Sequence, residues 1–231
     1  MLYSKNFAFI HTPKTGGMSV TRFLVNIIEE PLTLSVPAAA RTHALDMAET
    51  DDIRNKMTVL DGRRHEDPAA AIALMQDHGD PVPPRAFVVI RDPVDLMLSY
   101  YKHMRKPGVW RLRGMSKDTL RGAPKLAMEN DFDSFCHKAL FYNRDDAALA
   151  RYFDPAGFSE FDIVALKNLK PYLVSRFSDQ PRFDPARLEH RNKSKDPSTR
   201  DDLSAEVIAH IYATYPTIKR HYDTAAAQSY D

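Results

Sequence analysis

Short apolar runs and helical patterns alternate along the chain. Four runs have the length and apolar content of buried strands, at 6–11, 57–61, 86–90 and 161–166. Helical segments follow them, at 18–28, at 68–78, from Pro93 onward and up to about Phe177. Strands that alternate with helices favour a parallel sheet covered on both faces. The pattern therefore predicts an α/β, three-layer fold with a central parallel sheet flanked by helices.

The remaining segments fit the same domain. Residues 107–152 have the pattern of loops and helices, and 201–222 predict a C-terminal helix that is interrupted at Pro216. The chain has no internal repeat, no low-complexity segment and no clear linker, and its 231 residues suit one domain. We therefore expect a single domain over residues 1–231.

Composition and charge exclude several classes of protein. Lys and Arg number 32 against 31 Asp and Glu, so the net charge is +1, which argues against nucleic-acid binding driven by charge. Cys136 is the only cysteine, which excludes an intramolecular disulfide and a zinc site of several thiolates. Residues 1–9 lack a signal-peptide pattern, and no apolar stretch is long enough to span a membrane. These features predict a soluble, cytoplasmic protein.

A glycine-containing loop joins the first strand to the first helix, with the sequence Thr12-Pro13-Lys14-Thr15-Gly16-Gly17. Backbone N–H groups and the positive end of the helix dipole attract anions in such a loop. Gly16 and Gly17 allow a phosphate to approach the backbone, and Lys14 adds a positive charge. Thr15 and Ser19 add hydroxyl donors. The loop predicts a site for a phosphate-like group.

The spacing differs from that of the P-loop of nucleotide triphosphatases. That motif, G-x-x-x-x-G-K-[ST], places its lysine after the last glycine and supplies a hydroxyl for magnesium. Here Lys14 precedes both glycines. A Gly-Gly turn with a solvated lysine is the simpler interpretation of the loop alone.

A second candidate site follows the strongest strand, 86–90. Arg91 comes at its carboxyl end, and Ser99 lies eight residues later on the following helix. Ligands of open parallel sheets bind outside the carboxyl ends of the strands, so this pair can hold a second phosphate. The alternative is that Arg91 forms a surface ion pair with Asp92 or Asp95.

Together the two segments resemble the PAPS-dependent sulfotransferases of the carbohydrate and bacterial type. Phe9 to Ser19 is similar to the 5′-phosphosulfate loop of that family, an apolar strand followed by P-K-[TS]-G-[GT]-[TS]-[SW]. Val88 to Pro93, together with Ser99, is similar to its 3′-phosphate motif, R-[DN]-P-x-x-x-x-x-S-x-Y. Arg191 to Ser194 is a weaker match to a C-terminal N-x-S segment. Two positions depart from the family: Leu96 stands where Arg is frequent, and Met18 where a hydroxyl residue is common.

The resemblance implies a P-loop-like fold and a sulfotransferase. The donor would be 3′-phosphoadenosine 5′-phosphosulfate (PAPS), the product 3′,5′-bisphosphoadenosine (PAP), and no metal would be required. Transfer by in-line displacement depends on positioning and electrostatics, with Lys14 stabilising the leaving group. Residues 13–19 would hold the 5′-phosphate, from Pro13 through Lys14, Thr15, Gly16, Gly17 and Met18 to Ser19. Arg91 and Ser99 would hold the 3′-phosphate.

An acceptor hydroxyl needs a general base, and histidine suits neutral pH. His65 follows the second predicted strand, and His43 precedes a helix; both resemble family histidines, although Arg63 stands where the family often has another. Glu66 can orient His65 or act as the base itself. His11, at the end of the first strand, is expected to support the loop. The base is therefore His65, His43 or Glu66, and a surface role is the alternative for each histidine.

The acceptor is expected to be a small metabolite or a carbohydrate. A basic run suits an anionic acceptor such as an acidic glycan, and comprises Lys102, Arg105, Lys106, Arg111, Arg113, Lys117, Arg121 and Lys125. A solvated surface is the plainer interpretation of this run, and Trp110 within it suits either stacking on a sugar ring or a place in the core.

Two other functions remain open. One is a P-loop-type kinase that uses ATP, and the other is an inactive nucleotide-binding domain of the same fold. The sequence leaves the oligomeric state open.

Overall fold

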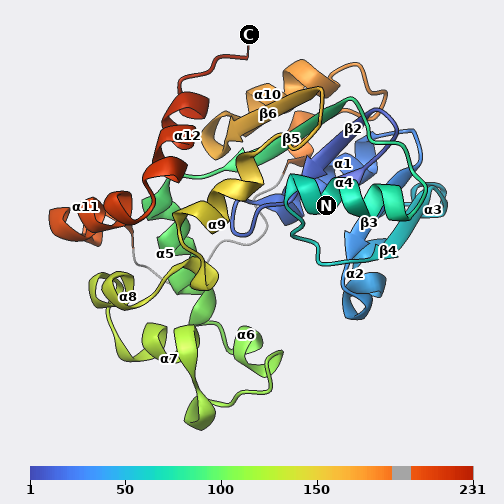
Figure 1. Ribbon diagram of the computed structural model, residues 1–231. Helices are drawn as coiled ribbons and strands as arrows, with labels where there is room; N and C mark the ends of the chain where they lie inside the picture. Colours follow the sequence, from blue (N-terminus) through green and yellow to red (C-terminus); the bar gives the residue numbers. More distant parts are fainter. Residues whose placement is uncertain (189–198, 231) are drawn as a thin grey trace. The chain divides into compact units, whose positions relative to one another are not determined.

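The computed structural model describes residues 1–188 and 199–230. The chain divides into two compact units (Figure 1). The first comprises Met1–Ile90, Arg151–Arg191 and His221–Asp231, and the second comprises Arg91–Ala150 and Asn192–Arg220. The β-sheet belongs to the first unit, whereas the described part of the second is helical.

Within the described residues, the sheet has six strands in the order β4-β3-β1-β2-β5-β6. Their bounds are Leu2–Tyr3 (β1), Phe7–Ile10 (β2), Leu32–Val36 (β3), Met57–Asp61 (β4), Arg85–Ile90 (β5) and Glu160–Ala165 (β6). β2 is parallel to β5, β5 to β6 and β3 to β4, whereas β1 is antiparallel to both β2 and β3. Five strands therefore share one direction, and their carboxyl ends meet at one edge of the sheet.

The prediction of a parallel sheet was wrong in one respect, because β1 makes the sheet mixed. This strand has only two residues, Leu2 and Tyr3, which is too short to be recognised as an apolar run. β3 was also missed, since Pro31 and Pro37 flank it and resemble loop residues. The four strands that the pattern predicted are confirmed, and each end lies within one residue of the predicted position.

Helices cover both faces of the sheet. Alternate side chains of a strand face opposite sides, and Phe9, Phe87 and Val89 pack in one core with α1 (Gly17–Ile27) and α10 (Leu169–Phe177). The short helices α2 (Arg41–Leu45) and α3 (Asp51–Asn55) add Ala44 and Ile53 to the same core. On the other side lies α4 (Pro68–Asp77) (Figure 1). The α/β class is thus confirmed, as a mixed sheet between helices.

The second unit is built around α5 (Pro93–Met104). Its other helices are α6 (Pro107–Arg111), α7 (Gly122–Glu129), α8 (Phe132–Lys138), α9 (Asp146–Ala150) and α11 (Ala205–Thr214). Tyr100 and Tyr101 of α5 are buried against Phe135 of α8. α12 (Pro216–Ala226) begins after a break at Tyr215, which confirms the interruption predicted at Pro216.

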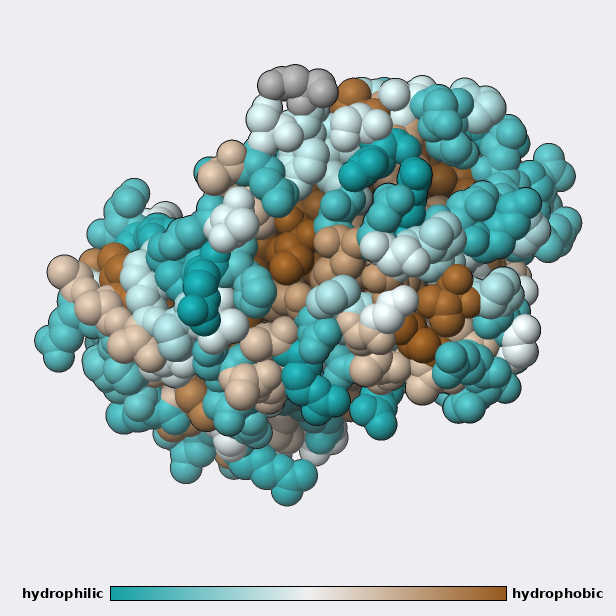
Figure 2. All heavy atoms as spheres, turned by 45° about the horizontal axis from the view of Figure 1, so that its top comes forward, coloured by the Kyte–Doolittle hydropathy of each residue, from teal (hydrophilic) through white to brown (hydrophobic). Residues whose placement is uncertain are grey.

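Apolar side chains are mostly enclosed. Among the described residues, the large hydrophobic side chains that are exposed are Leu112, Met128, Leu140 and Val174. Figure 2 shows one face on which hydrophilic side chains predominate and hydrophobic ones form small groups. Within the described ranges, no helix combines the length and the apolar character that crossing a bilayer requires.

Candidate functional site

The loop between β2 and α1 has the backbone of an anion site. Gly16, at the N-cap of α1, has a φ of 82°, and no side chain caps the helix there. The Ser19 amide donates to the Gly16 carbonyl at 2.9 Å, closing the first turn. The first amides of a helix have no carbonyl partner within it, and they point away from its N-terminus. Lys14 stands in the same loop with a φ of 66°, a left-handed backbone that non-glycine residues adopt at a cost.

Gly17 is required by a close contact with His11. A Cβ on Gly17 would lie 1.9 Å from Cδ2 and 2.0 Å from Nε2 of the His11 ring. His11 is buried and stacks on Phe9 of β2, with ring centroids 5.9 Å apart. The ring therefore fills the space beside the first residue of α1. This is the supporting position that the sequence suggested for His11.

Hydrogen bonds inside the loop fix its shape. The Thr15 hydroxyl donates to the Thr12 carbonyl at 3.0 Å, and the Thr12 hydroxyl donates to the Val89 carbonyl of β5 at 3.1 Å. Thr15 is 1% exposed. Thr15 was expected to offer its hydroxyl to a phosphate, but in this structure that proton is used within the loop.

The other loop residues divide between core and surface. Pro13 is buried, and Met18 is half-buried against the core, which explains an apolar side chain at that position. Ser19 is half-buried and lines a pocket on α1. Of the two hydroxyl residues predicted to contact a phosphate, Ser19 is the one placed at a pocket.

His65 contacts the loop directly. It lies in the segment after β4, and its Nδ1 is 2.8 Å from the His11 carbonyl oxygen. The two rings meet edge to face, with centroids 4.6 Å apart. A carbonyl only accepts hydrogen bonds, so Nδ1 carries the proton and Nε2 keeps its lone pair. The sequence predicts His65 near the edge of the sheet where the parallel strands end, and in the structure His65 contacts the β2–α1 loop there through His11.

Burial keeps both histidines neutral. It lowers the pKa of His65 to about 4, with the hydrogen bond to His11 opposing the shift. Burial also holds the pKa of His11 well below its usual value, and His65 adds to that effect. At neutral pH His65 is therefore an uncharged imidazole whose Nε2 can accept a proton.

Glu66 has a different position from the one expected. Its Oε1 accepts hydrogen bonds from the Ser35 hydroxyl at 2.5 Å and the Arg63 amide at 2.6 Å, and its Oε2 lies 3.2 Å from the α-amino group of Met1. Burial alone would raise the pKa of Glu66, but these donors hold it below its usual value. Both oxygens join the 62–66 segment to β3 and β1. Glu66 is thus a carboxylate whose position is fixed by Ser35, Arg63 and Met1.

His43 lies on α2, in the connection that follows β3, and its side chain is exposed. α2 packs against β3 and β4. The structure thus places the two candidate histidines differently. His65 contacts the loop, whereas His43 stands on the surface of a short helix.

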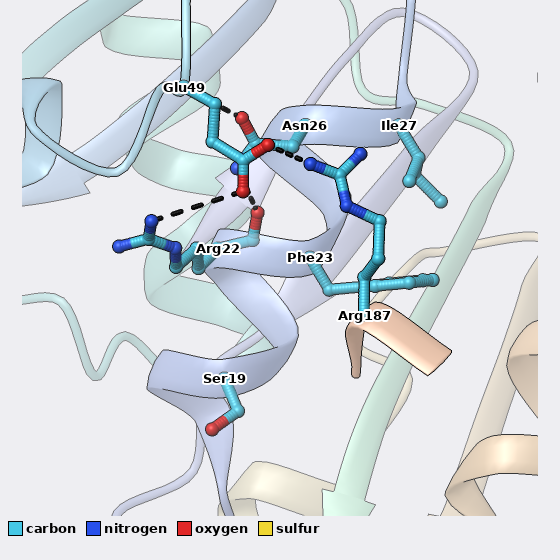
Figure 3. Close-up of a pocket in the computed structure, with 7 residues that line it drawn as sticks. All are labelled: Ser19, Arg22, Phe23, Asn26, Ile27, Glu49 and Arg187. Atoms are coloured by element: carbon cyan, nitrogen blue, oxygen red, sulfur yellow. Dashed lines mark hydrogen bonds and ion pairs between the residues drawn. The ribbon is translucent and has the colours of Figure 1, made fainter. Parts of the chain in front are cut away.

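A pocket beside the loop was not predicted from the sequence. It measures about 90 Å³ and is lined by Ser19, Arg22, Phe23, Asn26, Ile27, Glu49 and Arg187 (Figure 3). Glu49 lies between two arginines, 3.9 Å from Arg22 and in contact with Arg187. Its amide donates to the Asn26 side chain at 2.9 Å. Arg22 and Asn26 lie one and two helical turns beyond Ser19. This spacing places the three side chains on one face of α1, and it is the sequence feature from which the pocket could have been suspected.

Arg91 and Ser99 belong to the second unit. Arg91 directly follows β5, and Ser99 is a half-buried residue of α5. Asp92 caps α5, accepting from the Val94 amide at 2.8 Å. It also accepts from Tyr212 at 3.0 Å and pairs with Arg200 at 3.2 Å. Both oxygens of the Asp92 carboxylate therefore have partners within the second unit.

The basic run also lies in the second unit. Trp110 is 8% exposed, and its indole N–H donates to the Met104 carbonyl. Trp110 is therefore a core residue rather than an exposed platform for a sugar. Arg105 stacks on Tyr101, and Lys125 lies 3.8 Å from Glu129, so part of the run is engaged locally.

The chain matches no family model, no curated protein and no solved structure. The likeness to sulfotransferases therefore rests on the residues of the two motifs. The weaker match at Arg191 to Ser194 lies outside the described residues. Within the described ranges, no group of three or more His, Cys, Asp or Glu side chains is placed to hold a metal ion.

Proposed function

We propose that the protein transfers a sulfuryl group from PAPS to an acceptor hydroxyl or amine, releasing PAP. The observation that carries the proposal is the β2–α1 loop, an uncapped helix start with Gly16, Gly17 and a left-handed Lys14, against which His65 is seated. The similarity of the two motifs to the PAPS-dependent sulfotransferases supplies the identity of the donor.

The loop would bind the donor's 5′-phosphate. The amides at the start of α1 and the helix dipole suit an anionic phosphate group. Negative charge grows on the bridging oxygen as the S–O bond to PAP breaks. Lys14 is the proposed stabiliser of that oxygen, since its ammonium group is a point charge with three donors.

His65 is the proposed general base. Nδ1–H is committed to the His11 carbonyl, so Nε2 is the atom that would take the acceptor's proton. A pKa of about 4 makes it a weak base when the site is empty. A bound anion favours the imidazolium, and the donor itself would therefore raise this pKa toward neutrality. His43 remains the alternative base.

Assignment of the 3′-phosphate to Arg91 and Ser99 rests on their sequence pattern, R-D-P with a serine eight residues after the arginine. A contact to the 3′-phosphate would distinguish PAPS and PAP from ATP, ADP and AMP. An acidic glycan or a small anionic metabolite is the proposed acceptor, because the second unit carries the basic run.

Thermal unfolding with nucleotides tests the proposal. A ligand at 100 times its dissociation constant stabilises the folded state by about 2.7 kcal/mol, and each kcal/mol raises Tm by roughly 2–4 °C for a chain of this size. We expect PAP to raise Tm by roughly 5–10 °C in EDTA, and AMP or ADP to raise it much less. An equal response to PAP and ADP would contradict the 3′-phosphate assignment, and a response to ATP that needs magnesium would favour the kinase.

A screen of acceptors with sulfur-labelled PAPS then tests catalysis. Transfer of label to a hydroxyl or amine acceptor is the expected result. PAP binding without transfer to any acceptor class would favour the inactive nucleotide-binding domain.

A further inference from the structure

Arg64 is a basic residue at the candidate site that the sequence did not single out. It lies between Arg63 and His65 in the segment after β4 and has a φ of 71°. Lys14, in the β2–α1 loop, has a φ of 66°. The β2–α1 loop and the segment after β4 meet at the contact between His65 and His11. Each of them contains one basic residue, Lys14 or Arg64, whose backbone has left-handed φ values. Backbone strain of this kind is concentrated at active sites and ligand-binding segments.

The segment that carries Arg64 is held firmly in place. The Arg64 carbonyl accepts from the Met1 amino group at 2.8 Å. On one side of Arg64, the Arg63 amide donates to Glu66 at 2.6 Å; on the other, His65 bonds to the His11 carbonyl at 2.8 Å. The Tyr152 hydroxyl also donates to the His65 carbonyl at 2.9 Å. The Arg64 side chain therefore starts from a fixed point beside the loop.

The guanidinium group of Arg64 is incompletely satisfied. Its side chain is half-buried, and among the described residues its Nε is enclosed without a hydrogen-bond partner. A buried N–H left without an acceptor is costly, and native structures rarely keep one without a reason. Burial is the main cause that lowers the pKa values of His11, His65 and the Met1 amino group, and the nearby positive charge of Arg64 adds to each shift. Glu66 is the acid of this group, and both of its oxygens already accept hydrogen bonds.

We propose that Arg64 binds the sulfuryl oxygens of the donor, on the side of the β2–α1 loop where His65 lies. The inference rests on the proposed function, and it deepens it by separating the two anionic groups at the 5′ end of PAPS. The loop amides take the phosphate, and Arg64 takes the sulfuryl group through the terminal N–H groups of its guanidinium. A planar guanidinium suits this task, since it donates two parallel hydrogen bonds to one oxyanion. His65 Nε2 would then lie beside the sulfur atom that the acceptor attacks.

The test compares PAPS with PAP, because PAP lacks the sulfuryl group. Dissociation constants of both are measured by calorimetry for the full chain and for Arg64→Gln, Arg64→Lys and Arg63→Gln. Arg63 is the matched control, since it is the neighbouring arginine and its side chain is exposed. We expect Arg64→Gln to bind PAPS about ten- to a hundred-fold more weakly, the loss that hydrogen bonds to a charged group predict, and to bind PAP normally. The PAPS affinity of Arg64→Lys should lie between those of Arg64→Gln and the wild-type protein, and that of Arg63→Gln should equal the wild-type value.

Each outcome bears on one claim. Equal PAPS affinities for Arg64→Gln and the unchanged chain would overturn the role of Arg64 while leaving the donor site intact. Parallel loss of PAPS and PAP affinity would also overturn it, by assigning Arg64 to the phosphate or to the fold. If the wild-type protein bound neither PAPS nor PAP, the proposed function itself would be contradicted. Unfolding curves of the variants identify any change that arises from misfolding.

Discussion

The ring of His11 occupies the space that a side chain on Gly17 would need, with Cδ2 only 1.9 Å from the position of a Cβ. This contact couples the end of β2 to the first residue of α1. The carbonyl of His11 accepts a hydrogen bond from Nδ1 of His65 at 2.8 Å. His11 therefore contacts both the start of α1 and the candidate base.

Gly17→Ala should destabilise the protein and displace the loop. The new methyl group overlaps the buried His11 ring, and overpacking of this kind costs about 1–3 kcal/mol. Chemical unfolding monitored by circular dichroism measures the loss. Gly108→Ala is the control, because no atom of the described residues lies within 4 Å of a Cβ there, and we expect little change in stability.

A double variant isolates the cause. His11→Ala removes the ring, so adding it to Gly17→Ala should recover part of the loss, and the two effects should be clearly non-additive. Strict additivity would mean that Gly17 is required for another reason.

Acid should weaken the fold through His65. Its pKa is about 4 in the folded protein against 6.5 when exposed, so the unfolded chain binds more protons between these values. Stability is then full above pH 6.5 and falls as the pH decreases toward 4. The loss from this group between pH 7 and pH 5 is about 2 kcal/mol. Urea unfolding at a series of pH values measures it.

His65→Gln keeps a polar side chain but does not titrate in this range. We expect its stability to depend less steeply on pH between 6.5 and 4 than that of the unchanged chain. A residual slope would remain, because the pKa of His11 is lowered as well. Identical slopes for both proteins would show that His65 is not the group that titrates.

The strand, loop and helix from β2 to α1 could be predicted from the sequence because their features are local. A short apolar strand, two adjacent glycines and a helical repeat are enough to place a helix N-terminus at the end of a strand. The position of His65 near the same edge of the sheet could also be predicted, because the carboxyl ends of parallel strands lie at one edge.

Contacts that depend on distant segments were not accessible in this way. The hydrogen bond from Ser35 to Glu66 could not be predicted, because Ser35 lies on β3, a strand that flanking prolines concealed. Thr15 was assigned to a phosphate because the fold of the loop back onto Thr12 depends on the left-handed turn at Lys14 and Gly16. The unsatisfied Nε of Arg64 depends on how side chains enclose it, which sequence spacing does not specify.

Lys14→Ala should reduce turnover far more than it reduces nucleotide affinity. An electrostatic contact to the developing charge of a leaving group typically contributes about 100- to 1,000-fold in rate, whereas the loop amides continue to hold the phosphate. Labelled-sulfate transfer and PAP binding measure the two effects. Lys5→Ala, at an exposed lysine before β2, should change neither. Equal losses of turnover and PAP affinity would make Lys14 a binding residue only.

Separate substitutions of the two histidines should identify the base. His65→Ala should lower the rate of transfer about 100-fold or more, the usual contribution of general-base catalysis, because it removes the lone pair of Nε2 beside the loop. His43→Ala should have little effect, since that side chain is exposed on α2. The rate of the unchanged chain should fall in acid as His65 is protonated, with an apparent pKa that PAP raises above 4 in an NMR titration of the imidazole. His65→Ala would abolish that acid limb of the rate profile. Full activity of His65→Ala together with loss in His43→Ala would transfer the role of base to His43, and it would leave His65 as the residue that secures the loop through His11.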